Sequence, residues 1–279
     1  MKQAIQILEF NKIKQTVDSL CACSLGQKRV EYLSPSVDEK QVEYSLNQSD
    51  EALKIILALG EAPLGGVTDI TEAIKRAKIS AMLSAQELLG ISRLLYAVSQ
   101  LKTFSERLNE IKVDTPIFSS QVNSLVSLNS LQTAINDCID ETGYVLDSAS
   151  SELRSIRRSI QSTEARIKEK LNHVVSERRN KLTDSIVTIR NERYVVPVRA
   201  EAKNTFGGTV HDQSSSGNTY FIEPKEVVDL NNKLQEYHVE ERREIERILR
   251  ALTEEVKKFV DALAVNVEVL GEIDFMFAK

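Results

Sequence analysis

The sequence lacks tryptophan, and aromatic residues make up only 5% of its 279 positions. Glycine and proline are also scarce, with 10 and 5 residues. Sandwiches and barrels need many turns and aromatic core residues, so this composition argues against them. Leucine, isoleucine, valine, alanine, glutamate, lysine and arginine dominate instead, which is typical of long helices. A chain of this length can bury a core in one or two domains.

Cysteine occurs only 3 times, and no apolar run approaches the roughly 18 residues that span a bilayer. Cys21, Cys23 and Cys138 lack the spacing of metal ligands, so we expect reduced thiols, no bound metal and a cytoplasmic protein. The N-terminal segment 1–14 is amphipathic and charged, which argues against a secretory leader.

Charge is distributed unevenly along the chain, whose formal net charge is −5. Residues 151–225 contain 14 Lys or Arg and 9 Asp or Glu, whereas the remainder contains 22 and 32. A basic segment within an acidic protein indicates a local contact with a polyanion. A solvated helix surface explains the same pattern, and the composition leaves both interpretations open.

Residues 1–115 are predicted to form packed helices, the helical core of the chain. Ser36 to Glu39 and Ser84 to Glu87 match the capping box that opens a helix. The helix after Ser84 is expected to end near Ile111, before the Asp-Thr-Pro break. Segment 116–149 is predicted to connect this core to the next part, with one helix over 117–140.

Two narrow apolar stripes follow this connection. In 150–183, Leu153, Ile160 and Ile167 recur every seven residues among mostly polar positions. Residues 225–265 carry a second stripe in steps of three and four. Because each stripe has room for a single partner helix, the two helices are predicted to pair in an antiparallel, coiled-coil-like arm.

Residues 184–224, between these helices, change to short runs of β-branched and aromatic residues. The runs SIVTI, RYVVPVR, GTVHDQ and NTYFIE predict four mostly antiparallel strands at the far end of the arm. Pro197 would remove one ladder donor, which indicates an edge or a bulge. The predicted fold class is mainly α: a helical core and long antiparallel helices, with a small antiparallel four-stranded β element at their tip.

The stretch GGTVHDQSSSGNTYFIEP (207–224) combines His211, Asp212 and three serines, the components of a hydrolase triad. Neighbouring residues on a strand point to opposite faces, so His211 and Asp212 are not expected to hydrogen-bond. No G-x-S-x-G elbow accompanies them. Gly217 suits the tip of a hairpin, because glycine adopts positive φ without steric cost. We therefore predict no catalytic residue here.

The same turn offers hydroxyl and backbone N–H groups, which bind phosphate oxygens well. Basic side chains lie on the neighbouring strands and at the end of the first long helix. The candidate nucleic-acid-binding residues are Arg178, Arg179, Lys181, Arg190, Arg193, Arg199, Lys203, Ser214, Ser215 and Ser216. Such a set predicts salt-sensitive binding that is independent of nucleotide sequence.

The segment IVTIRNERYVVPVRAEAKNTFGGTVHDQSSSGNTYFIEPKEVVDLNN (186–232) resembles the clamp of the MutS family, in its second branch, which is not devoted to mismatch repair. LEFNKIK (8–14), EAPLGGVTDI (61–70) and SASSELRSIRRSI (148–160) resemble the same branch. The resemblance implies that the two long helices are levers and that the four strands form a clamp at their tip.

The same resemblance implies domains beyond those present in this sequence. In this branch a dimerising ABC-type ATPase domain, which uses ATP and Mg, follows the levers, and a nuclease-like Smr domain comes later. GEIDFMFAK (271–279) resembles the start of that ATPase domain, so 266–279 is expected to begin it. We therefore expect a core–lever–clamp fragment that has no cofactor and no catalysis of its own.

The resemblance also implies partners. Whole proteins of this branch are implied to be homodimeric ATPases and endonucleases that suppress recombination, or that split collided ribosomes. The fragment is then expected to clamp DNA or ribosomal RNA, away from any membrane. The alternative left open is a structural arm whose β tip docks a protein partner, through TYFIEP (219–224), or mediates dimerisation.

Overall fold

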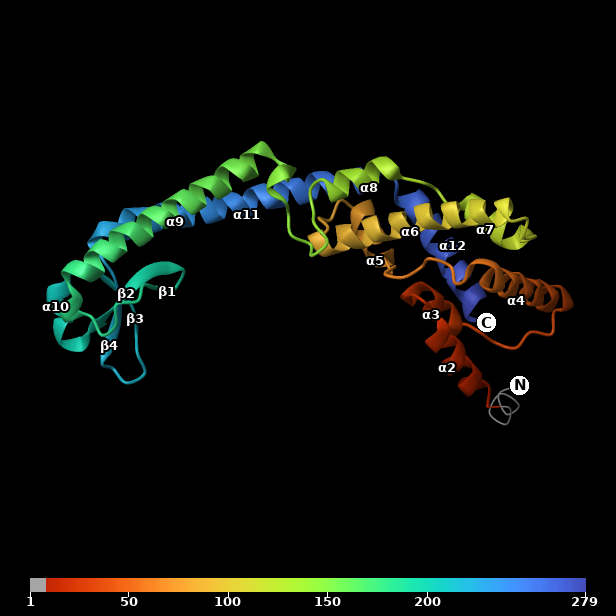
Figure 1. The fold of residues 1–279 in the computed structure, drawn as a ribbon, viewed down its shortest axis with the longest axis horizontal. Coiled ribbons are helices and arrows are strands. Elements are labelled where there is room, and N and C mark those ends of the chain that lie inside the picture. The colour runs from red at the N-terminus through yellow and green to blue at the C-terminus, as the bar shows by residue number, and fades with distance from the viewer. Residues whose placement is uncertain (1–8) are drawn as a thin grey trace. The chain divides into compact units, whose positions relative to one another are not determined.

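A computed structural model of the chain describes residues 9–279. The first eight residues, which hold more than half of the amphipathic segment 1–14 and the first residue of LEFNKIK, lie outside the described residues. The described part contains eleven α-helices and one four-stranded antiparallel sheet (Figure 1), which confirms the predicted mainly α class. Within it, no helix combines the length and the hydropathy that crossing a membrane requires.

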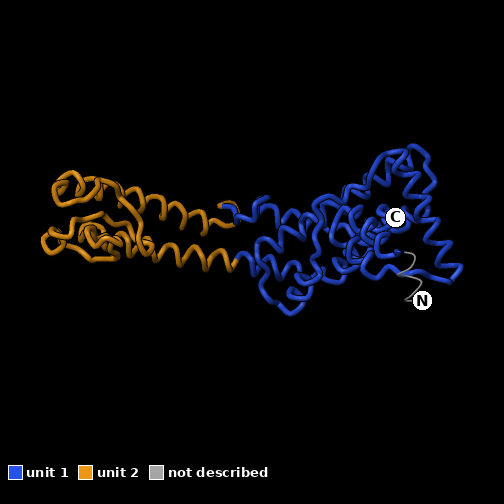
Figure 2. Tube along the Cα trace, turned by 90° about the horizontal axis from the view of Figure 1, so that it is seen from below, with its two compact units in different colours: residues 1–146, 248–279 blue, residues 147–247 orange. Residues whose placement is uncertain are grey.

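The chain divides into two compact units (Figure 2). The first unit combines the residues up to 146 with residues 248–279, and the second unit consists of residues 147–247. The segment boundaries expected from the sequence stay predictions.

The first unit is built around its last helix. Its helices are α2 (Phe10–Leu20), α3 (Ser24–Glu31), α4 (Glu39–Leu59), α5 (Thr71–Lys78), α6 (Ala85–Glu110), α7 (Pro116–Ser124), α8 (Asn129–Asn136) and α12 (Val260–Ala278). Helix α12 packs against α2, α3, α4, α5, α6 and α7. Leu263, Leu270 and Ile273 are fully buried on it, as expected for a helix that is apolar on most of its sides.

Of the two capping boxes predicted in this unit, one is present and one is not. The capping box of Ser84 and Glu87 is confirmed, and α6 ends next to Ile111 as predicted. The box predicted at Ser36 is wrong, because the carboxylate of Asp38 caps α4 by accepting from the backbone N–H groups of Lys40 and Gln41.

The single helix predicted over 117–140 is in fact two helices, α7 and α8. The side chain of Asn266 on α12 accepts from the backbone N–H of Val126 at 2.8 Å and donates to its carbonyl at 2.9 Å. These two bonds hold residue 126 outside a helix, since they use the groups that a helix would pair internally.

Two long helices form most of the second unit. Helix α9 spans Ser151–Glu177, and α11 spans Val228–Lys257, of which the residues up to 247 belong to this unit. Arg157, early in α9, forms a 2.7 Å ion pair with Glu241 near the middle of α11. Lys170, later in α9, donates to the carbonyl of Glu226, just before α11, so the helices run antiparallel. Helix α11 ends at Lys257, whereas the sequence predicted a helix that continues to 265.

The predicted apolar stripe on α9 is buried, including Ile160, Ile167 and Leu171. The helix pair also contains a polar section, which the apolar stripes did not predict. There Arg157 bonds Glu241 and Asp147, and the Oγ atom of Ser150 donates to Glu244 at 2.6 Å.

The sheet lies at the end of this helix pair where α9 ends and α11 begins. Its strands are β1 (Thr188–Arg190), β2 (Arg193–Arg199), β3 (Thr209–Gln213) and β4 (Thr219–Glu223), in the order β1-β2-β4-β3. All neighbouring strands are antiparallel, so the predicted four-stranded element is confirmed. Short helical segments complete the unit. The turn η1 (Asp147–Ala149) precedes α9, and η2 (Arg179–Lys181) follows it. Between β2 and β3 lie η3 (Ala200–Ala202) and α10 (Lys203–Phe206), and η4 (Lys225–Val227) precedes α11.

Pro197 lies in β2, which is a central strand rather than an edge strand. Its pairing with β1 covers only residues 193–195, so β1 has already ended at the proline. The carbonyl of Pro197 accepts from Thr183 on that same side. The missing N–H points to this side, away from β4 and beyond the end of β1, so the four-stranded ladder loses no bond. The bulge of the sheet lies at His211 in β3 instead.

Candidate nucleic-acid interface

A buried carboxylate organises the sheet of the second unit. Glu223 on β4 is only 2% exposed, and its oxygens contact groups from three other elements. Arg193 on β2 and Asn231 on α11 each donate to it at 2.8 Å, and Nε2 of His211 on β3 lies 2.6 Å away. A carboxylate this deeply buried needs such partners, because desolvation of its charge is otherwise very costly.

These contacts determine what the His-Asp-Ser stretch can do. His211 uses its Nε2 atom on Glu223, while Asp212 pairs with Arg190 on β1 at 3.2 Å. The hydroxyl of Ser214 accepts from the backbone N–H of Thr219 and lies 3.3 Å from that of Ser216. The arrangement is thus a structural network and differs from the nucleophile–base geometry of a triad. Among residues 9–279, no group of His, Cys, Asp and Glu could hold a metal ion.

Three of the candidate cations are neutralised within the unit. Arg178 forms an ion pair with Glu226, and its guanidinium lies 5.3 Å from the ring centre of Phe206. The other two are Arg190, which pairs with Asp212, and Arg193, which pairs with Glu223. Their charge is already satisfied, so they offer less to an external anion.

The other four cations, Arg179, Lys181, Arg199 and Lys203, make no ion pair with any carboxylate among residues 9–279. We call them the open cation group. Lys181 donates to the carbonyl of Thr205 at 3.0 Å, beside Lys203 on α10. Arg199 donates to the carbonyl of Leu182 at 2.9 Å, directly after Lys181. The structure therefore brings together η2, the end of β2 and α10.

The serine turn adjoins the open cation group. Arg199 is paired with Thr219 in the sheet, and the backbone N–H of Ala200 donates to the carbonyl of Asn218. Gly217 has φ of 75°, as predicted for the hairpin tip. Ser214 is occupied within the turn, whereas Ser215 and Ser216 are exposed. The turn therefore places two exposed serines at the same end of the sheet as Arg199.

The aromatic residues of the sheet are not free for base stacking. Tyr194 is buried, and burial together with the nearby Glu164 raises the pKa of its hydroxyl. The ammonium of Lys203 lies 4.1 Å from the ring centre of Tyr220, and the guanidinium of Arg190 lies 4.4 Å from that of Phe221. Such cation–π contacts cover both rings.

The segment TYFIEP is not an exposed docking surface either. Ile222, Glu223 and Pro224 are all buried. This burial argues against the alternative in which the β tip docks a protein through these residues.

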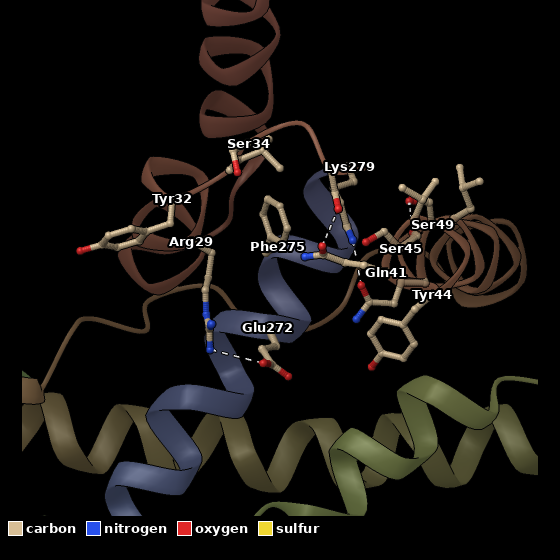
Figure 3. Close-up of a pocket in the computed structure, with 15 residues that line it drawn as sticks. Arg29, Tyr32, Ser34, Gln41, Tyr44, Ser45, Ser49, Glu272, Phe275 and Lys279 are labelled. Carbon is tan, nitrogen blue, oxygen red and sulfur yellow. Dashed lines mark hydrogen bonds and ion pairs between the residues drawn. The ribbon is translucent and has the colours of Figure 1, made fainter. Parts of the chain in front are cut away.

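The first unit contains a cavity of about 700 Å³ between α3, α4 and α12 (Figure 3). Tyr32, Tyr44 and Phe275 line it, and Arg29 pairs with Glu272 across it at 3.5 Å. Its polar groups mostly bond one another, as Lys279 does with Gln48 at 2.8 Å. The cavity therefore offers no obvious catalytic pair.

No family model matches the chain. The entire chain is 48% identical to Endonuclease MutS2 of Bacillus cereus (strain ATCC 10987 / NRS 248). It is 47% identical to proteins of the same name from Bacillus thuringiensis (strain Al Hakam) and Bacillus anthracis. The resemblance to the second branch of the MutS family is thereby confirmed. The chain spans 36% of the length of these MutS2 relatives.

Residues 186–232, which resemble the clamp of the MutS family, contain both the buried carboxylate network and part of the open cation group. They include Glu223 with its partners, and also Arg199 and Lys203 of the open cation group. Sequence reasoning missed Glu223 and Asn231, because an acidic residue at the end of a strand carries no signal of burial. The one local signal is the position of Glu223 at the end of an apolar run, directly before Pro224, where a buried side chain is more common than on a polar strand.

Proposed function

We propose that the second unit binds the phosphate backbone of a nucleic acid through the open cation group and the exposed Ser215 and Ser216. One observation carries this proposal: four cations without carboxylate partners gather beside a turn with exposed hydroxyls. Lysine, arginine and serine side chains are common donors to phosphate oxygens. Without paired carboxylates, these cations need not break an internal ion pair in order to bind.

The proposed contact is electrostatic and independent of nucleotide sequence. Each phosphate neutralised by a lysine or arginine releases counterions, so affinity falls steeply with salt. Base stacking plays little part, because Tyr220 and Phe221 lie beneath cations.

The relatives carry the name endonuclease, which denotes cleavage within a nucleic-acid chain. In a longer MutS2-like protein, we propose that this unit holds the nucleic acid while cleavage and the ATP- and Mg-dependent steps occur elsewhere. We further propose that the longer protein works as a homodimer. Phosphate chemistry is shared by DNA and ribosomal RNA, so the test below includes both.

Fluorescence anisotropy of the chain with branched DNA and with double-stranded RNA, each at several salt concentrations, tests the proposal. We expect the double variant Lys181→Glu/Lys203→Glu to weaken binding by about tenfold or more near physiological salt. The matched control is Lys78→Glu, which reverses an exposed charge in the first unit and should change affinity less than about twofold. Equal effects of the two variants would refute the proposed interface. A preference for one ligand would identify the target.

A further inference from the structure

Helix α4 has an apolar face that none of the described residues of its unit covers. Figure 1 shows this helix at the margin of the first unit. The exposed side chains are Val42, Leu46, Leu53 and Leu57, which are between 39% and 79% exposed. At about 100° per residue, all four fall within an arc of about 60°. Glu51 and Ile55, on the other side of the helix, are buried in the unit. Contiguous exposed apolar faces mark interaction sites.

The spacing of this stripe is symmetric. Its members are separated by four, seven and four residues, so the pattern reads the same in both directions along the helix. Two copies of α4 can therefore lie antiparallel about a two-fold axis between Ser49 and Asp50. Val42 of each copy then faces Leu57 of the other, and Leu46 faces Leu53. This is the self-complementary pairing that an isologous dimer contact requires.

The charges beside the stripe favour the same arrangement. Glu43 and Lys54 lie on one flank, about 100° and 120° around the helix from Val42. They are also at similar distances from the midpoint of the stripe. An antiparallel pair sets this flank of each copy against the same flank of the other, and so brings Glu43 near Lys54 of the partner. A parallel pair would set it against the opposite flank, which holds no lysine. Asp50, near the axis, already has Lys54 of its own helix at 2.7 Å.

The opposite flank carries small and apolar side chains. Ser45 and Ser49 have small side chains there, beside Ile56, which is 37% exposed and adds apolar surface to this flank. Ser45, Ser49, Val42 and Leu46 also line the cavity of Figure 3, so a second helix on the stripe would lie against the mouth of that cavity.

We propose that α4 is a self-association surface, on which the α4 helix of a second copy of this chain packs antiparallel. The contact is separate from the dimerisation through an ATPase domain that the family resemblance implies. It is also small. A stable interface includes about 20–30 residues a side, and α4 offers far fewer. The expected dissociation constant therefore lies in the micromolar to millimolar range, as for a contact that supplements others.

Sedimentation velocity of the chain over a wide concentration range tests this proposal. We expect a reversible dimer that disappears in Leu46→Glu/Leu53→Glu. The control is Ile79→Glu, which changes an equally apolar residue, 76% exposed, outside the stripe. It should dimerise like the unchanged chain. All substituted positions are exposed, and circular dichroism confirms that each variant is folded. A chain that is monomeric at every concentration, or a dimer indifferent to both variants, overturns the proposal.

Charge exchange tests the antiparallel pairing itself. Glu43→Lys and Lys54→Glu should each weaken the dimer about fivefold or more, because each brings like charges together. The combined variant restores opposite charges across the axis, so its dissociation constant should return to within about threefold of the original. Failure of this rescue would mean that some other surface or arrangement covers the stripe, which also overturns the proposal.

Discussion

The Nε2 atom of His211 lies 2.6 Å from Oε2 of the buried Glu223, on the neighbouring strand. The next residue, Asp212, pairs with Arg190 on β1 instead. Strands β1 and β3 are the two edges of the sheet by strand order, yet this pair and the bond from Asn191 to the carbonyl of His211 join them. The two edge strands are therefore linked to each other, and Arg190, one of the candidate nucleic-acid-binding residues, serves this link.

Glu223→Ala tests the importance of the buried carboxylate. The change leaves Arg193, His211 and Asn231 without their common acceptor, so we expect the second unit to lose about 3–5 kcal/mol of unfolding free energy. Hydrogen exchange of the β3 and β4 amides measures this locally, and should accelerate by orders of magnitude. Glu201→Ala, an exposed control on η3, should cost less than about 0.5 kcal/mol. Similar exchange in both variants would contradict the assignment.

Gly208→Ala tests the close packing of β3 on β4. A Cβ atom at Gly208 would lie 2.1 Å from the carbonyl oxygen of Glu223, and φ is +135°, where other residues are strained. We expect a loss of more than about 2 kcal/mol of unfolding free energy, measured by urea titration of the circular dichroism signal. Gly207→Ala is the matched control, because φ is +83° but nothing lies near its Cβ position. It should cost about 1 kcal/mol, and equal losses would rule out the clash.

Arg157 tests the polar section between α9 and α11. Its side chain is only 8% exposed and bonds both Glu241 and Asp147. We expect Arg157→Ala to lower the unfolding free energy by about 2–4 kcal/mol, since Glu241 loses its cation in a largely buried position. The double variant Arg157→Leu/Glu241→Leu should be close to neutral, because it replaces the pair by packed apolar groups. If the double variant is the less stable one in urea titrations, this explanation fails.

Cys23 gives a prediction about pH. Burial, and then the hydrogen bond from its thiol to Asp274 at 3.1 Å, raise the pKa of Cys23 from 9.0 to about 11. The folded state thus favours the protonated thiol. Its contribution to stability is complete below pH 9 and is lost as the pH rises to about 11. We expect negligible alkylation of Cys23 at pH 8, measured by mass spectrometry, and faster alkylation in Asp274→Asn. Rapid reaction of the unchanged chain at pH 8 would contradict the burial.

The salt dependence of binding distinguishes open from paired cations. Removing one open cation, as in Arg199→Ala, should reduce the slope of log affinity against log salt by about 0.7–0.9. Arg178→Ala, which removes a cation already paired with Glu226, should leave the slope nearly unchanged. Anisotropy titrations at four salt concentrations give both slopes. A smaller slope for Arg178→Ala than for Arg199→Ala would reverse the proposed roles.

The sequence was most informative where one periodicity dominated. The seven-residue recurrence of Leu153, Ile160 and Ile167 predicted a helix with one buried face, and the runs around 188–223 predicted the strands. Local chemistry also sufficed at Ser84, because a capping box depends only on residues three positions apart.

Other features depended on distant residues and left no local sign. Asn266 divides the region 117–140 into two helices from 140 positions away along the chain. The distinction between Arg199, which is open, and Arg193, which is paired, required knowing that Glu223 turns inward. Both residues look alike in sequence, as basic residues at the two ends of one strand. Charge composition located the basic region but could not show which of its charges are already neutralised.

Asn231 has a mechanical consequence for the second unit. Its carboxamide accepts from the backbone N–H of Tyr194 and donates to the carbonyl of the same residue, as a neighbouring peptide group would. These two hydrogen bonds fix the rotation of helix α11 relative to strand β2. The helix cannot rotate about its own axis without breaking them. A torque about the axis of α11 would therefore rotate the whole sheet together with the helix, instead of being absorbed as slippage between α11 and β2.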